Sequence, residues 1–304
     1  MGSAWHKCAG LHKAASFIDI DRTFFVSGGA KAQGRMLKLL VSVIEKRPAL
    51  RRRVWQFWYQ HLAGYRISNW TFMNYGYVCR NDAHSPLLLD QSDESDRCCI
   101  QLYHRVAGAV DLENQTVLEV GSGRGGGASY VTRYLNPTSL TGIDFSGKVV
   151  ELCNRTHRVE NLTFVQGDAE ALPFDNASFD AVVNVESSHC YGSVPDFLKE
   201  AARVLRPGGQ FLFADFRSPH DIEPLKQSFD DAGMTLLDEE DISANVVQAM
   251  EWEDERKCSL IQKHIPGWLC SVFRQFAGVQ DSTVFNSFKN GSLKYVRFVA
   301  TKSV

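Results

Sequence analysis

The middle of the chain alternates short apolar runs with segments in which apolar residues recur at helical spacing. Five of the apolar runs predict strands, at 116–120, 140–143, 162–166, 179–185 and 209–214. This alternation is typical of a parallel sheet built from strand and helix units, so we expect an α/β fold. Ligands of open parallel sheets bind beyond the carboxyl ends of the strands, and the residues after each run are therefore where a site is expected.

The sequence after this middle part predicts a cap over the sheet. Residues 234–237 and 293–301 predict two further strands, and the second alternates apolar with polar positions. Between them, residues 244–264 and 267–276 have helical patterns that include several aromatic side chains. A helical insertion between two late strands is expected to cover the crevice at the sheet edge.

These patterns divide the chain into three segments. We expect a basic lead-in and helix over residues 1–53, a helical lid segment over 54–110, and the core over 111–304. The cap is expected as an insertion into the core at about 243–277.

Charge is unevenly distributed along the chain. Residues 1–53 hold 11 Lys and Arg against three Asp and Glu, a formal charge of +8 in a chain whose total is −2. With the aromatic residues Trp55, Phe57 and Trp58 nearby, this segment could make peripheral contact with a membrane surface. The alternative is a helix that packs on the core and leaves its basic side in solvent.

Composition limits the classes of partner and cofactor. The near-neutral total charge gives no global field for nucleic acid, so we expect no nucleic-acid partner. The eight cysteines lack the spacing of a zinc site or a disulfide framework, and no metal is predicted. No apolar run approaches the roughly 18 residues of a membrane span and the start does not look like a secretory signal, so a cytoplasmic location is expected.

The segment with the strongest chemical signal joins the first predicted strand to a glycine-rich loop and a helix, in the sequence VLEVGSGRGGG at 117–127. Glycines in such a loop let the backbone approach a ligand closely. Gly121, Gly123 and Gly126 also match the dinucleotide fingerprint, so a nicotinamide-dependent dehydrogenase has to be considered.

Three acidic residues follow or end successive predicted strands. Glu119 suits a ligand with an ammonium group better than a pyrophosphate, and the methionyl part of S-adenosylmethionine has such a group. Asp144 can accept hydrogen bonds from a ribose diol, and Asp168 can accept one from an adenine amino group. Each acid alone could be a loop cap, but three at neighbouring strand ends favour a cofactor site.

Linked motifs in this region resemble the class I S-adenosylmethionine-dependent methyltransferases: VLEVGSG, GIDFS, GDAEALPFD, FDAVVNVESSH and VLRPGGQFLFADF. More narrowly, residues 54–302 resemble the group of phthiotriol/phenolphthiotriol dimycocerosates methyltransferases, which O-methylate a hydroxyl of a long lipid. The segments that carry this narrower resemblance are FMNYGY at 72–77, GGGASY at 125–130, NVESSHCY at 184–191 and FAGVQ at 276–280.

The resemblance implies a Rossmann-like seven-stranded methyltransferase sheet with helices on both faces and a helical cap. It implies S-adenosylmethionine as cofactor and S-adenosylhomocysteine as product. The cofactor-binding residues that it implies are Glu119, Gly121, Ser122 and Gly123 at the methionyl end, Asp144 and Phe145 at the ribose and adenine edge, Asp168 and Ala169 at the adenine, Asn184 after the fourth strand, and Tyr77 as a lid. For Tyr77, simple packing under the cap is the alternative.

Methyl transfer to a hydroxyl requires removal of a proton, because a protonated alcohol is a poor nucleophile. His189 follows the fourth predicted strand and is our candidate base, with Glu186 as the residue that orients it. The alternative is a histidine that only packs. Tyr191 is a weaker candidate base, and Arg124 and Arg217 are expected to be solvated, although Arg217 could orient a substrate oxygen.

We therefore expect a methyltransferase that acts on a hydroxyl of an apolar small molecule or lipid. Carbon methylation of a quinone or sterol-type precursor would use the same cofactor half and remains an alternative. So does a protein that binds S-adenosylmethionine without turnover.

Overall fold

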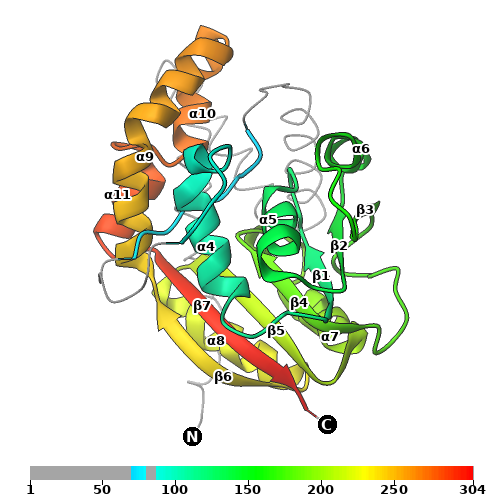
Figure 1. Ribbon diagram of the computed structural model, residues 1–304. Coiled ribbons are helices and arrows are strands. Elements are labelled where there is room, and N and C mark those ends of the chain that lie inside the picture. Colours follow the sequence, from blue (N-terminus) through cyan, green and yellow to red (C-terminus); the bar gives the residue numbers. More distant parts are fainter. Residues whose placement is uncertain (1–69, 80–86, 304) are drawn as a thin grey trace, which may run out of the picture.

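A computed structural model describes residues 70–79 and 87–303 of the chain (Figure 1). The predicted basic segment 1–53 and most of the first half of the predicted lid segment lie outside these residues. The described strands are β1 (Thr116–Val120), β2 (Ser139–Asp144), β3 (Leu162–Gln166), β4 (Phe179–Val185), β5 (Leu205–Arg217), β6 (Met234–Asp241) and β7 (Lys294–Lys302).

These strands form one seven-stranded sheet in the order β3-β2-β1-β4-β5-β7-β6. Neighbouring strands from β3 to β5 are parallel, whereas β7 runs antiparallel to both β5 and β6. β2 and β3 lie on one side of β1, and β4 and β5 lie on its other side. The strand order therefore reverses between β1 and β4, which is where open α/β sheets bind ligands.

Helices cover both faces of the sheet, as predicted (Figure 1). Side chains that alternate along a buried strand belong to two different apolar clusters: Val117 and Val183 to one, Leu118 and Val182 to the other. The helices and 3-10 turns before the cap are η1 (Glu94–Asp96), α4 (Arg97–Ala107), α5 (Gly126–Leu135), α6 (Gly147–Thr156), η2 (Ser188–Cys190), α7 (Val194–Val204) and α8 (Pro219–Asp231).

The helices divide between the two clusters. Buried residues of α4, α5 and α6 pack in the first cluster, and those of α7 and α8 pack in the second. Serine side chains fix the starts of two of these helices, because Ser146 accepts a hydrogen bond from Val149 N and Ser193 accepts one from Asp196 N.

The predicted helical insertion between the last two strands is present. It comprises α9 (Ser243–His264), η3 (Gly267–Leu269), α10 (Cys270–Phe276) and α11 (Thr283–Lys289). The last of these helices was not predicted. In Figure 1 the cap helices stand beyond one end of β7, next to α4.

Two strands are longer than predicted. β6 continues through the acidic run 238–241, which has no apolar alternation. Basic side chains of the neighbouring β7 form ion pairs with these acids: Arg297 Nε lies 3.1 Å from Glu240, and Lys294 Nζ lies 2.8 Å from Asp241. β5 runs from Leu205 to Arg217, whereas the predicted strand covered only residues 209–214.

No helix of the described residues is long and apolar enough to cross a membrane.

Gly127→Ala tests the packing of α5 against α4. A Cβ at Gly127 would overlap the ring of Tyr103, which is held in place by a 2.6 Å hydrogen bond to Glu119. We expect the free energy of unfolding, measured in urea, to fall by about 1–3 kcal/mol because of overpacking. Gly267→Ala is the control, since no described heavy atom lies within 4 Å of its added Cβ. Wild-type stability of Gly127→Ala would contradict this packing.

Candidate active site

The loop between β1 and α5 holds three glycines with φ in the left-handed region: +76° at Gly121, +51° at Gly123 and +81° at Gly125. Other residues adopt these angles at a cost, so glycine is favoured at each position. A Cβ at Gly121 would also lie 2.7 Å from the hydroxyl of Tyr191, closer than ordinary contact allows. The backbone of the loop is thus packed directly against the residues that follow β4.

Glu119 is a carboxyl group buried at the base of this loop, with 1% of its surface exposed. The hydroxyl of Tyr103 donates to its Oε1 at 2.6 Å, but Oε2 has no hydrogen-bond partner among the described residues. Burial raises the pKa of Glu119 to about 8, even though the Tyr103 hydrogen bond lowers it. An unpaired buried acceptor costs about 1–3 kcal/mol, so this oxygen fits a ligand that brings a hydrogen-bond donor.

Ser122 Oγ and Asn184 Oδ1 are also buried without a partner among the described residues. The amide nitrogen of Asn184 donates to Val120 O at 2.9 Å and to Ser187 Oγ at 2.8 Å, which fixes the orientation of the amide. Together with Glu119, these residues place unpaired polar atoms at the end of β1 and beside it. The arrangement fits the ammonium and hydroxyl groups of S-adenosylmethionine.

Asp144 ends β2 and is tied to the glycine loop. Its Oδ2 accepts a hydrogen bond from Gly123 N at 3.0 Å, and its Oδ1 accepts one from Ser146 N at 2.9 Å. Burial raises the pKa of Asp144 to about 6, against the effect of these two amides. Each oxygen keeps a second lone pair, so the carboxyl group can still accept from a diol. Phe145 follows with 40% of its surface exposed, and its ring is accessible to a flat ligand.

Asp168 lies two residues beyond the end of β3. Its Oδ1 accepts from Glu170 N at 3.1 Å, and the preceding Gly167 N donates to Asp144 O at 3.0 Å. Ala169 is partly buried against the second apolar cluster. The three predicted acids therefore lie at the carboxyl ends of adjacent strands, but at successive depths: Glu119 within its strand, Asp144 at the end and Asp168 beyond it.

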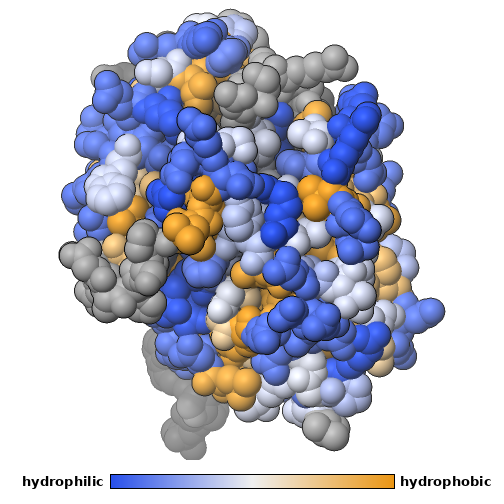
Figure 2. All heavy atoms as spheres, viewed as in Figure 1, coloured by the Kyte–Doolittle hydropathy of each residue, from blue (hydrophilic) through white to orange (hydrophobic). Residues whose placement is uncertain are grey.

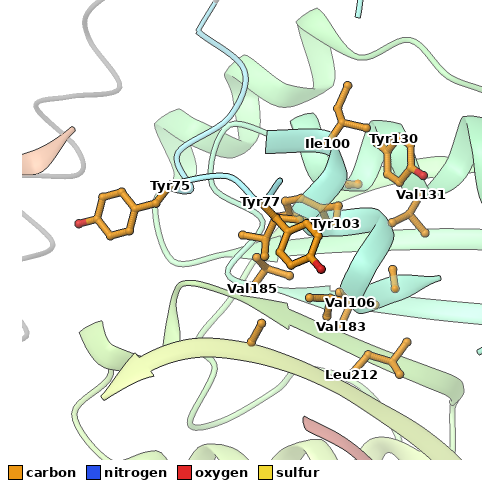
Figure 3. Close-up of a cluster of buried hydrophobic side chains, with 14 of the residues drawn as sticks. Tyr75, Tyr77, Ile100, Tyr103, Val106, Tyr130, Val131, Val183, Val185 and Leu212 are labelled. Carbon is orange, nitrogen blue, oxygen red and sulfur yellow. The ribbon is translucent and has the colours of Figure 1, made fainter. Parts of the chain in front are cut away.

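The segment 70–79 crosses over the glycine loop and sends two tyrosines in different directions. Both rings are buried in the first apolar cluster, but Figure 3 shows Tyr77 directed toward Val185 and Tyr103, whereas Tyr75 extends in another direction, where it packs on Phe216 and Phe288. Alternation along an extended chain would put both rings on one side, but Gly76 between them has φ +88°. The structure thus gives Tyr77 a packing position and brings Tyr75, which sequence reasoning missed, toward the site.

His189 lies in η2, directly after β4, and is held by a buried carboxylate. Its Nδ1 is 2.8 Å from Asp215 Oδ1, and its backbone N–H donates to Oδ2 at 2.9 Å. Burial lowers the pKa of His189, but the neighbouring Cys190 and Asp215 raise it by more, so the pKa lies well above its usual value. The His189 side chain is 17% exposed, and because Asp215 holds Nδ1, Nε2 is the nitrogen at which the ring could accept a substrate proton.

Glu186 does not orient His189, contrary to our prediction. Its Oε2 accepts from Tyr75 N at 3.0 Å and from the Tyr295 hydroxyl at 2.9 Å, so it joins segment 70–79 to β7. Burial raises its pKa to about 7. Its φ of +49° is unusual for a glutamate and costs about 1–3 kcal/mol, as is common at functional sites. The residue that orients His189 is Asp215, which lies 26 positions later in the sequence and gave no signal there.

Two arginines that we expected to be solvated are buried. Arg217 is 4% exposed, donates to Ser188 Oγ at 2.6 Å and lies 3.2 Å from Asp215. Arg124 is 7% exposed, donates to Trp70 O and lies over the Trp70 ring. Both have partners far away in the sequence, which a local pattern cannot reveal.

A cavity that is partly open to solvent lies between segment 70–75 and the cap helices. Most of its lining is apolar, and its charged lining residues are Asp96, Arg256 and Lys257. Tyr75 connects the cavity to His189, since both of their rings pack on Phe216, with centroids 5.9 and 4.4 Å away. The molecular face in Figure 2 is mostly hydrophilic with separate apolar patches.

Comparisons with known proteins agree with this geometry. A family profile described as a methyltransferase domain matches residues 118–213. A phthiotriol/phenolphthiotriol dimycocerosates methyltransferase of Mycobacterium tuberculosis is 41% identical over 252 residues, which cover 83% of this chain and 93% of that protein. A fatty-acid O-methyltransferase of Mycolicibacterium smegmatis is 44% identical over 198 residues, 65% of this chain and 72% of that protein.

Among solved structures, the [4+2]-cyclase SpnF has a similar fold, with a TM-score of 0.64 and 23% identity over 83% of this chain and 96% of that one. A likeness of this kind shows the fold alone, because one fold supports several reactions.

The strand order, the glycine loop with its buried carboxyl group and the profile match define a class I S-adenosylmethionine-dependent methyltransferase, as predicted. S-adenosylmethionine is its cofactor. Within this class, the chain belongs to the group of the phthiotriol/phenolphthiotriol dimycocerosates methyltransferases.

Proposed function

We propose that this enzyme transfers the methyl group of S-adenosylmethionine to a hydroxyl of a lipid or other apolar acceptor, which enters through the cavity under the cap. The observation that carries the proposal is the His189–Asp215 pair, which is linked to an apolar cavity through the rings of Phe216 and Tyr75. A base is needed when the nucleophile is an alcohol, and a cavity with a mostly apolar lining suits a hydrocarbon chain. The names of the two relatives, a phthiotriol and a fatty-acid methyltransferase, support a lipid acceptor.

We assign the cofactor to the edge of β1, β2 and β3. Glu119 Oε2 accepts from the ammonium group, with Gly121, Ser122 and Gly123 along the methionyl part. Asp144 accepts from the ribose, Phe145 and Ala169 contact the adenine, and Asp168 accepts from its amino group. Asn184 contributes its unpaired Oδ1 from β4. Tyr77 is left out, because its ring packs in the core (Figure 3).

The bound cofactor supplies an electrophilic methyl group. His189 accepts the hydroxyl proton at Nε2, while Asp215 holds Nδ1 and stabilises the imidazolium that forms. Arg217 and Ser188 hold Asp215 in turn, so the carboxylate keeps one orientation. Glu186 keeps segment 70–79 over the site through Tyr75.

Carbon methylation of a quinone or sterol-type precursor would not need this base in the same way, and a binding protein without turnover would not need it at all. Product analysis after incubation with labelled cofactor separates these functions, since only O-methylation gives an ether or ester methyl. Membrane contact through residues 1–53 and a cytoplasmic location stay predictions.

His189→Asn tests the base. Because the pKa of His189 is raised, its neutral fraction grows as the pH rises above neutral, and we expect wild-type kcat with a long-chain hydroxy lipid to increase with pH in that direction. In His189→Asn, kcat should fall about 100- to 10,000-fold and lose this rise. His220→Asn, an exposed histidine on α8, is the control. An unchanged pH profile in His189→Asn, with normal cofactor affinity, would rule out the base.

Glu119→Gln tests the ammonium contact. With a pKa of about 8, Glu119 is mostly protonated at neutral pH, and an ammonium group favours the carboxylate. We expect binding of S-adenosylhomocysteine at pH 7 to release about one proton, as measured calorimetrically in buffers of different ionisation enthalpy. Glu119→Gln should abolish the release and weaken binding about tenfold or more.

Tyr103→Phe is the matched variant for Glu119→Gln, since it removes the hydrogen bond to Oε1 but keeps the carboxyl group. It should still release the proton. If Glu119→Gln released as many protons as the wild type, the ammonium would have to bind elsewhere.

A further inference from the structure

Lys257 brings a positive charge to the wall of the apolar cavity. It lies on α9, and its Nζ is 3.3 Å from Ala277 O and 5.9 Å from the centre of the Tyr75 ring. Ala277 and Tyr75 both line the cavity, so the ammonium group lies between two lining residues. Ala277 O takes one of its three N–H donors, which leaves donors for another acceptor.

The nearby acids are engaged elsewhere. Glu253 pairs with Arg256, and Asp96 accepts from Thr71 Oγ1 at 3.0 Å and lies 3.5 Å from Arg256. No carboxylate of the described residues lies within ion-pair distance of Lys257 Nζ. A partly buried ammonium in an apolar wall is costly without a partner, and a ligand oxygen would supply one.

We infer that Lys257 is a specificity-determining residue that binds an acyl oxygen of the acceptor, either a carboxylate or an ester carbonyl. The cavity then takes an amphiphile whose hydrocarbon chain contacts residues such as Ile261 and Phe273, and whose acyl group lies at Lys257 next to Tyr75. This inference deepens the proposed function, since it rests on the same cavity. It adds that long-chain acyl compounds are recognised by a charge-assisted hydrogen bond and not by apolar contact alone.

The test compares three ligands of equal chain length, palmitate, methyl palmitate and 1-hexadecene, delivered from cyclodextrin to the full-length protein with S-adenosylhomocysteine bound. Dissociation constants are measured by intrinsic tryptophan fluorescence, which Trp70 in the cavity lining makes sensitive to binding. Lys257→Met removes the charge and keeps much of the apolar stem. Lys257→Arg keeps a donor, and Lys263→Met, at an exposed position of the same helix, is the matched control.

We expect Lys257→Met to weaken palmitate about tenfold and methyl palmitate about threefold, and to change 1-hexadecene less than about twofold. Lys257→Arg should retain most of the palmitate affinity, and Lys263→Met should behave as wild type. If Lys257→Met weakens the binding of palmitate alone, the acyl oxygen that Lys257 binds is that of a free carboxylate and not of an ester.

Three results would overturn the inference: equal weakening of all three ligands, no weakening of any, or no binding of any to the wild type. Because S-adenosylhomocysteine affinity and methyl transfer to hydroxy lipids are measured separately, any of these results leaves the proposed function testable by itself.

Discussion

The site is organised by one constraint: a carboxyl group, Glu119, is buried near the carboxyl end of β1 with only one of its oxygens paired among the described residues. Burying such a group costs free energy, and the cost is recovered when a cationic ligand supplies the missing donor. The structure around it serves this arrangement. Tyr103 fixes the carboxyl group from α4, and Gly127 leaves the room that the Tyr103 ring occupies.

The short segment 70–76 links the cofactor edge to the acceptor side. Thr71 O accepts from Gly126 N at 3.1 Å, at the start of the helix that follows the glycine loop. Four residues later, Tyr75 N donates to Glu186 and its ring lines the cavity. A displacement of this segment would therefore move the glycine loop, the residues after β4 and the cavity wall together. An enzyme that brings two substrates into contact needs their two binding sites held in a fixed relative position.

The sequence predicted the fold well because the core strands are apolar on both faces and leave a simple pattern. β3 and β4 begin and end at the predicted residues, and the helical insertion begins where the pattern placed it but continues to Lys289 instead of ending near residue 277. The pattern failed where charges replace apolar residues. The end of β6 is four acids in a row, and it is a strand because basic side chains of other elements pair with it.

The candidate site was predictable wherever function leaves a local motif, as with Glu119 and His189. It was not predictable where a role depends on contacts between distant segments. Asp215 looks like any acid after a strand until the fold brings it 2.8 Å from the His189 ring. Tyr75 and Tyr77 are both buried aromatic residues, and only the backbone turn at Gly76 directs the Tyr75 ring toward the cavity. Such assignments need the three-dimensional arrangement.

A crystal structure of the complex with S-adenosylhomocysteine tests the central claim most directly. The account predicts that the ammonium nitrogen lies within about 3.2 Å of Glu119 Oε2, with the ribose on Asp144. A complex in which Glu119 Oε2 stays without a partner, or faces the ligand's own carboxylate, would contradict it.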